Sequence, residues 1–211
     1  MAADQPSSTA SRAQPRPLTG GAVMTAASQV TAAATGFLTT VVVARVLGLE
    51  GTAAFTVAMS LVLMLMTVSS LGLESGLTWM LSARRWGARP AFAHAQAAAL
   101  VLGLAGLGVG LAARVIVPDA FQGLSVALVL FLCAALPFNL SWLYSSYVAL
   151  AVDAYERYVV APALQAVVTL VGVAALSFPF GIEGAIAGLV ASHVVTALVL
   201  LVWNRRRLPP D

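Results

Sequence analysis

The chain has 211 residues, of which 60% are hydrophobic and only 9% charged, and its mean hydropathy is +0.94. A soluble domain carries about a quarter charged residues, and a water-soluble fold cannot hide this much apolar surface. The net charge of +3 comes from eleven scattered arginines without interleaved aromatic residues, which argues against a nucleic-acid-binding surface. The composition indicates an integral membrane protein.

Residues 1–17 contain prolines, serines and two arginines but no apolar core, so they do not resemble a signal peptide and are expected to form a disordered cytoplasmic tail. Six apolar stretches follow, each long enough to span about 30 Å of hydrocarbon as a helix. Their predicted ranges are 18–44, 53–81, 91–117, 124–151, 158–178 and 182–203. The predicted fold is an all-α transmembrane lobe over residues 18–203, followed by a basic cytoplasmic tail at 204–211.

The arginines predict the orientation of these spans. With a cytoplasmic N-terminus, nine of the eleven fall in cytoplasmic segments, and only Arg45 and Arg114 fall outside. Arginines near the ends of spans resist translocation and keep their segments in the cytoplasm. We therefore expect both termini to be cytoplasmic in a multi-pass protein of the bacterial plasma membrane.

Polar residues recur at helical spacing in the first two spans. In the first, the stripe contains Gly21, Thr25, Ser28, Thr35 and Thr39, with Gln29 and Thr40 beside it. In the second, it contains Thr52, Thr56, Ser60, Thr67, Ser70 and Glu74. Serine and threonine can bond their own backbone or hold helices together. Taken together, the two stripes also suit a common polar cavity, because polar groups facing lipid are costly.

Small and polar residues mark the later spans. Gly106 and Gly110 in the third span predict close helix packing, as do Gly184, Gly188, Ser192 and Thr196, at steps of four, in the sixth. Pro137 predicts a kink in the fourth span, with Asn139 and several hydroxyl-bearing residues just beyond it. In the fifth span, Pro162, Gln165, Thr169 and Gly172 share one face.

The ionisable residues of the spans are few. Arg45 either anchors the helix at the membrane interface or has a function, and Glu74 is a further functional candidate. His94 and His193 lack metal-ligand spacing and are expected to be packing residues. Cys133, the single cysteine, excludes an internal disulfide. No metal, cofactor or enzymatic motif is predicted.

The segment from residue 41 to residue 77 resembles the amino-terminal part of polysaccharide flippases of the multidrug/oligosaccharidyl-lipid/polysaccharide exporter superfamily. The matching residues are Ala44, Arg45, Leu47, Gly48, Phe55, Leu71, Gly72 and Leu73. The glycine-rich sixth span, which begins GIEGAIAGLVASHVV, is also similar to the last helix of that family's first lobe. The resemblance implies movement of lipid-linked saccharides between leaflets by alternating access between two six-helix lobes.

This chain supplies one such lobe. The resemblance therefore implies a second lobe, formed either by self-association or by another polypeptide, since repeat-built transporters place the substrate between their lobes. It also places Arg45 near an anionic headgroup. The candidate substrate-binding residues are Arg45, Gln29, Glu74, Asn139 and Gln165.

Three functions remain open at the level of the sequence. The first is a flippase lobe for lipid-linked saccharides in cell-envelope polysaccharide export, with membrane lipids and the saccharide lipid as partners. The second is a non-transporting membrane partner or a truncated, inactive flippase. The third is a drug or cation antiporter of the same superfamily, for which Glu74 is the one available buried carboxylate.

Overall fold

A computed structural model of the protein describes residues 18–121, 124–152 and 154–208, and every regular element in these ranges is helical. The predicted tail at 1–17 lies outside the described residues. The elements are α1 (Leu18–Ser70), α2 (Leu73–Ser82), α3 (Ala88–Ile116), the short 3-10 helix η1 (Pro118–Phe121), α4 (Val126–Ala134), α5 (Leu136–Ala151) and α6 (Tyr155–Arg207).

In the described part of the chain, four helical stretches are long and apolar enough to cross a membrane. They lie in α1, in α3, across α4 and α5, and in α6. The prediction of a helical multi-pass membrane protein is therefore confirmed. Six separate membrane helices are not observed, because the first and last predicted pairs are each joined into one element of 53 residues.

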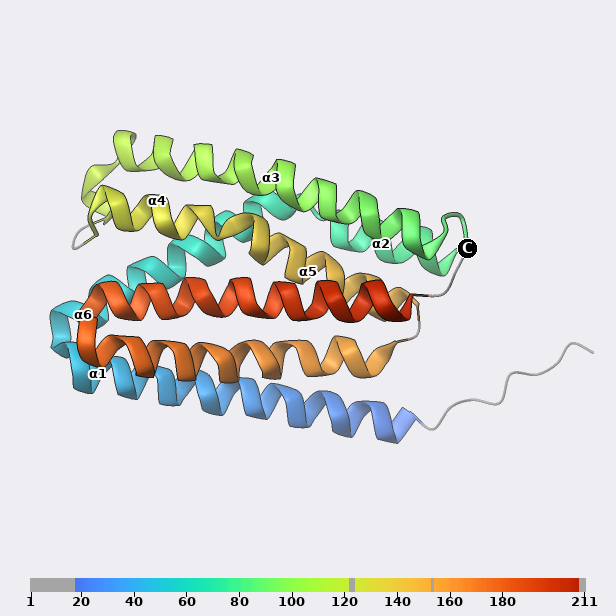
Figure 1. Ribbon diagram of the computed structural model, residues 1–211, viewed down its shortest axis with the longest axis horizontal. Coiled ribbons are helices and arrows are strands. Elements are labelled where there is room, and N and C mark those ends of the chain that lie inside the picture. Colours follow the sequence, from blue (N-terminus) through green and yellow to red (C-terminus); the bar gives the residue numbers. More distant parts are fainter. Residues whose placement is uncertain (1–17, 122–123, 153, 209–211) are drawn as a thin grey trace, which may run out of the picture.

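Helices α1 and α6 each turn back on themselves at a glycine. Gly48 in α1 has φ 69° and Gly181 in α6 has φ 60°, and both residues are non-helical. A side chain would strain this left-handed backbone, whereas glycine adopts it freely. In Figure 1 the ribbon reverses direction within both helices. Each helix thus has a first and a second arm, at 18–47 and 49–70 in α1 and at 155–180 and 182–207 in α6.

The two remaining irregularities lie within the predicted second and fourth spans. Leu71 and Gly72, with φ of 49° and 70°, separate α1 from α2. Ala135 separates α4 from α5, two residues before Pro137, which confirms the predicted kink. At the C-terminal end, α6 continues through Arg207, beyond residue 203 where the last span was expected to end.

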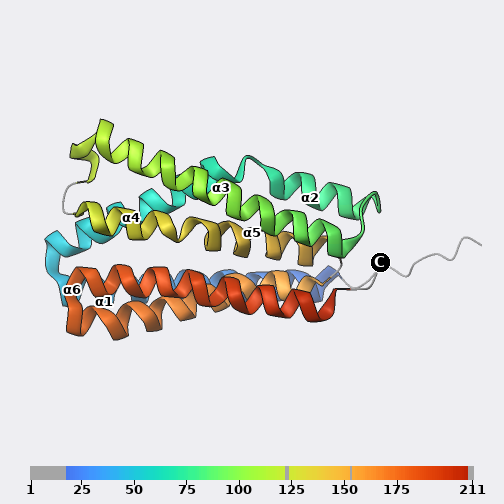
Figure 2. The same cartoon turned by 45° about the horizontal axis from the view of Figure 1, so that its top comes forward.

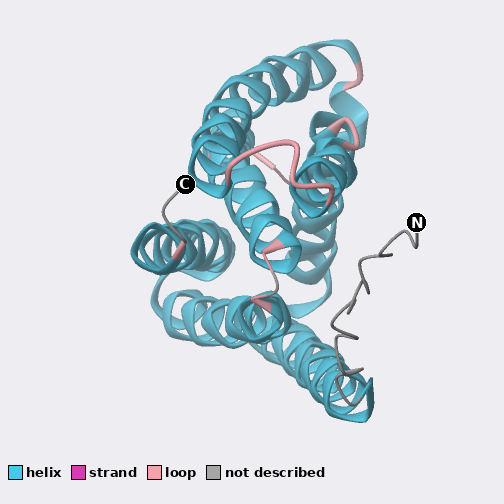
Figure 3. Cartoon of the chain, turned by 90° about the vertical axis from the view of Figure 1, so that its right-hand side faces the viewer, coloured by secondary structure: helices cyan, strands magenta, loops and turns pink. Residues whose placement is uncertain are grey.

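The arms lie side by side in one bundle. Figure 1 shows the first arm of α6 between the first arm of α1 and the second arm of α6, with α4 and α5 along the other side of α6, and Figure 2 gives the same bundle from a second direction. The second arm of α1 crosses toward α2 and α3 at the far side of the bundle. Figure 3 looks along the helices, so that the arms are seen almost end-on.

Close packing between helices follows the small residues. Gly184 and Gly188 are buried, and Ser192 and Thr196 are at most 1% exposed, so the stripe predicted in the sixth span is confirmed as a packing seam. Gly106 and Gly110 of α3 are also buried, against Ser69 and Cys133. Small side chains allow backbones to approach each other where the hydrophobic effect does not drive helices together.

Candidate substrate cavity

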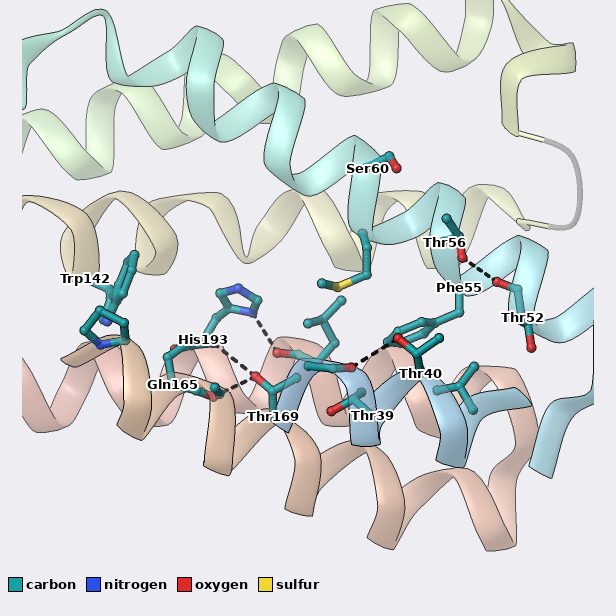
Figure 4. A pocket seen from close by; sticks show the side chains of 16 residues that line it. Thr39, Thr40, Thr52, Phe55, Thr56, Ser60, Trp142, Gln165, Thr169 and His193 are labelled. Atoms are coloured by element: carbon teal, nitrogen blue, oxygen red, sulfur yellow. Dashed lines mark hydrogen bonds between the residues drawn. The ribbon is translucent and has the colours of Figure 1, made fainter. Parts of the chain in front are cut away.

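A cavity of about 440 Å³ lies between the two arms of α1, the two arms of α6 and α5. Sixteen residues line it (Figure 4). The fold brings them together because both long helices reverse, which places residues 36–43 of α1 opposite residues 52–60 and both beside α6. The cavity is thus a product of the two glycine turns.

One wall of the cavity carries a hydrogen-bonded network within α6. The side-chain nitrogen of Gln165 donates to the hydroxyls of Thr169 at 3.3 Å and Ser192 at 3.2 Å. These two hydroxyls are also hydrogen-bonded to each other, at 2.9 Å. The hydroxyl of Thr196 contacts the side-chain oxygen of Gln165. The network therefore joins the two arms of α6 across the seam of small residues.

His193 adds an imidazole to this wall. Its Nδ1 lies 2.7 Å from the carbonyl oxygen of Leu189, and a carbonyl can only accept a hydrogen bond, so Nδ1 carries the proton. In the neutral ring, Nε2 is then an acceptor. His193 lines the cavity, and its ring can accept a hydrogen bond from a hydroxyl or amide of a ligand.

The hydroxyls from α1 line the opposite side. Thr39, Thr40, Thr52 and Thr56 each donate to the carbonyl four residues earlier, at 2.6 to 3.1 Å. These four threonines of the predicted stripes thus satisfy their own backbone and also line a common cavity, whereas Thr35, Thr67, Ser70 and Glu74 of the same stripes do not line it. Each hydroxyl oxygen can still accept a hydrogen bond from a ligand.

Apolar side chains complete the lining, among them Val43, Phe55, Met59 and Leu189. None of the described residues that line this cavity is an aspartate, glutamate, lysine or arginine. The lining therefore offers neutral hydrogen-bonding groups beside hydrophobic surface, which suits a ligand with both polar and apolar parts.

A smaller cavity, of about 150 Å³, lies toward the beginning of α1 and α6. Thr25, Ser28, Gln29 and Tyr158 are among its lining residues. Trp142 and Pro162 line both cavities, so the two cavities are neighbours. The indole nitrogen of Trp142 is buried and has no hydrogen-bond partner among the described residues. A buried donor without an acceptor lowers the stability of a fold by about 1–3 kcal/mol, unless water or a ligand accepts a hydrogen bond from it.

Of the five candidate residues from the sequence, Gln165 and the exposed Gln29 line a cavity, and Asn139 is buried. Gln165 lines the large cavity and Gln29 the small one. Asn139 is 1% exposed, and its side-chain nitrogen has no hydrogen-bond partner in the described part of the chain. Asn139 lines neither cavity, although it lies one helical turn before Trp142 on α5.

The other two candidates lie apart from both cavities. Arg45 is exposed, three residues before the turn at Gly48. Glu74 lies in the first turn of α2, and its Oε2 atom is buried without a hydrogen-bond partner among the described residues. The structure therefore does not bring Arg45 and Glu74 together with Gln165 around one ligand position.

Sequence reasoning missed several lining residues. The sequence predicts a packing role for His193, yet it lines the large cavity, and Trp142 and Met59, which no sequence motif marks, line it as well. The signal for His193 was its place next to Ser192 in the sixth-span stripe. Phe55 is marked only by the family resemblance, and nothing in the sequence distinguishes Met59 from other apolar residues of a membrane span. In the described residues, no group of three or more His, Cys, Asp or Glu side chains could hold a metal ion.

Comparison with known proteins finds a solved structure with a similar fold. No family model and no curated protein matches the chain. Its structure is similar to a crystal structure of a mutant MATE protein, with a TM-score of 0.71 and 20% sequence identity. The match covers 86% of this chain and 43% of that one, so this chain spans less than half of its neighbour's length. At this sequence identity the likeness shows the fold alone.

Proposed function

We propose that this protein is one lobe of a membrane transporter that moves lipid-linked saccharides between leaflets during export of bacterial cell-envelope polysaccharides. The observation that carries the proposal is the large cavity, with its uncharged hydroxyl, amide and imidazole groups beside apolar side chains. Sugar hydroxyls require such neutral donors and acceptors, and a polyprenyl chain requires the apolar surface. The transporter fold of the neighbour supports the assignment.

The topology proposed for this lobe is six membrane crossings with both termini in the cytoplasm. A straight helix of 53 residues would be about 80 Å long, whereas the hydrocarbon core is about 30 Å thick. Each arm of α1 and α6 is about the length of one crossing, and the turns at Gly48 and Gly181 would lie outside. Arg84, Arg85 and Arg89, together with residues 205–207, would then face the cytoplasm.

The site would be completed by a second lobe. The chain covers 43% of the neighbouring structure, and repeat-built transporters bind their substrates between two halves. We propose a second copy of this chain or another six-helix polypeptide in that role. Arg45 would contribute at the outer end, where its charge attracts the diphosphate of a lipid-linked saccharide.

Antiport of a drug or cation is the second candidate function, and Glu74 favours it. A buried carboxylate oxygen without a hydrogen-bond partner is a natural place for a coupling proton or sodium ion, because a nearby cation or a bound proton removes the cost of burying the charge. The MATE likeness suits this reading as well. The two functions differ in which residue they need, Gln165 for a saccharide and Glu74 for coupling.

Transport in liposomes tests the proposal. The protein is reconstituted with a fluorescent polyprenyl-linked saccharide, and exposure of the saccharide on the opposite leaflet is followed over time. Gln165→Leu should slow transport at least tenfold. The matched control is Gln96→Leu, since Gln96 also joins helices, through Ser141 and Ser145, but lines neither cavity.

Equal activity in wild type and Gln165→Leu would refute the assignment of the cavity. Ion-coupled uptake of a cationic dye that is lost in Glu74→Gln, without saccharide movement, would favour the antiporter instead. No transport of either kind, even with native membrane partners present, would leave a non-transporting partner as the better description. Transport by a demonstrated monomer would refute the need for a second lobe.

A further inference from the structure

The end of α6 carries a groove of about 520 Å³ that belongs to neither interior cavity. Its lining residues are Leu198, Val199, Val202, Trp203, Arg206 and Arg207. They follow each other at alternating steps of one and three, so they form a single face of the second arm of α6. Leu198, Val199 and Val202 are 41–49% exposed, which places this face on the outside of the bundle.

The residue types change in order along this face. Three aliphatic side chains come first, then a tryptophan, then two arginines at the end of the helix, over on the order of 12 Å. Tryptophan concentrates at the level of lipid headgroups, and arginine contacts phosphates beyond it. The order of residue types along the groove therefore matches the order of the parts of a phospholipid, from its acyl chain to its headgroup.

Among the described residues that line the groove, the positive charge of Arg206 and Arg207 is not balanced by an acidic side chain. Arg207 is close enough to Arg157 for their charges to repel each other. Arg157 is held in place, because its guanidinium donates to the side-chain oxygen of Asn204 at 2.9 Å, and Asn204 is fully buried. The negative end of the α6 dipole offsets about half a charge, whereas residues 205–207 carry three. An anion bound here would relieve the repulsion.

We propose that this groove is a binding site for an anionic phospholipid, separate from the transport cavity. The acyl chain packs along Leu198, Val199 and Val202, and Trp203 lies beside the glycerol backbone. The phosphate accepts hydrogen bonds from Arg206 and Arg207. A zwitterionic phospholipid binds more weakly, because its own ammonium group competes for the phosphate. The site does not depend on transport of any substrate.

Native mass spectrometry of the full chain, delipidated in detergent and titrated with phosphatidylglycerol or phosphatidylcholine, tests the proposal. Wild type should retain phosphatidylglycerol preferentially. Arg206→Gln with Arg207→Gln should weaken that retention roughly thirtyfold, from about fivefold for each basic residue at an anionic surface. Arg206→Lys with Arg207→Lys keeps the charge and should retain most of the binding.

The matched control is Arg84→Gln with Arg89→Gln, which removes two exposed arginines that are absent from the groove. An equal loss in this control would reduce the effect to general surface charge and overturn the site. Equal retention of the two lipids by folded wild type would overturn it too. A fall in dimer content in the glutamine variant, with lipid retention unchanged, would show that this face instead contacts a second copy.

Discussion

The carbonyl carbon and oxygen of Gly172 lie 2.4 Å from the position that a Cβ atom on Gly188 would occupy. The two arms of α6 therefore touch backbone to backbone, with no room for a side chain. Gly188 lies four residues before Ser192. The contact therefore also sets the distance between the two arms that the hydrogen bond from Gln165 to Ser192 spans.

Gly188→Leu should accordingly disrupt the bundle. Backbone atoms cannot move aside as a flexible side chain can, so we expect a loss of 3 kcal/mol or more, at about the upper end of the range for overpacked cores. The measurement is the temperature at which detergent-extracted protein loses its monodisperse state. Gly108→Leu is the control, because nothing lies within 4 Å of a Cβ at Gly108. If Gly188→Leu is as stable as wild type, the backbones of the two arms of α6 are not in contact at this position.

Asn204 should be a second determinant of stability. Its side chain accepts from Arg157 and donates to the carbonyl of Ser145, both at 2.9 Å, so it joins α5 and both ends of α6. Asn204→Leu removes both of these hydrogen bonds of a buried side chain and should lower the free energy of unfolding by about 1–3 kcal/mol. The same thermal assay measures it, with the exposed neighbour in Arg205→Gln as control. If the two variants lose their folded state at the same temperature, the hydrogen bonds to Asn204 contribute little to stability.

Orientation can be tested by cysteine labelling. Cys133 is 1% exposed, so a Cys133→Ser background should fold and give no signal. In that background, an impermeant maleimide added to intact cells should label Glu50→Cys and Glu183→Cys, which follow the two glycine turns. Ser82→Cys should react only after the cells are permeabilised. All three residues are exposed. Labelling of Ser82→Cys in intact cells would refute the proposed topology.

We expect Arg45 to contribute to transport through its positive charge. In the liposome assay, Arg45→Ala should weaken transport of the polyprenyl-linked saccharide, and Arg45→Lys should restore part of it without the planar fork of guanidinium. Arg114→Ala is the control, since it removes the other arginine that is predicted to lie outside. Full activity in Arg45→Ala would reduce Arg45 to an interface anchor.

The sequence by itself determined the features that depend on one helix at a time. The length and apolarity of each run predicted membrane helices, Pro137 predicted the break before α5, and steps of four predicted the seam through Gly188. These features are local, because a break depends on the backbone at that point and a stripe depends only on the helical repeat.

Only the tertiary structure decided which stripes meet. Helical periodicity fixes the angle of a side chain about its own axis, but it does not fix how that axis is rotated against its neighbours. The pairing of Gln165 with Ser192, 27 residues away, therefore needed the turn at Gly181 and the close approach of the two arms. For the same reason only the packing of the helices shows that Trp142 lines two cavities and that Arg45 lies away from both.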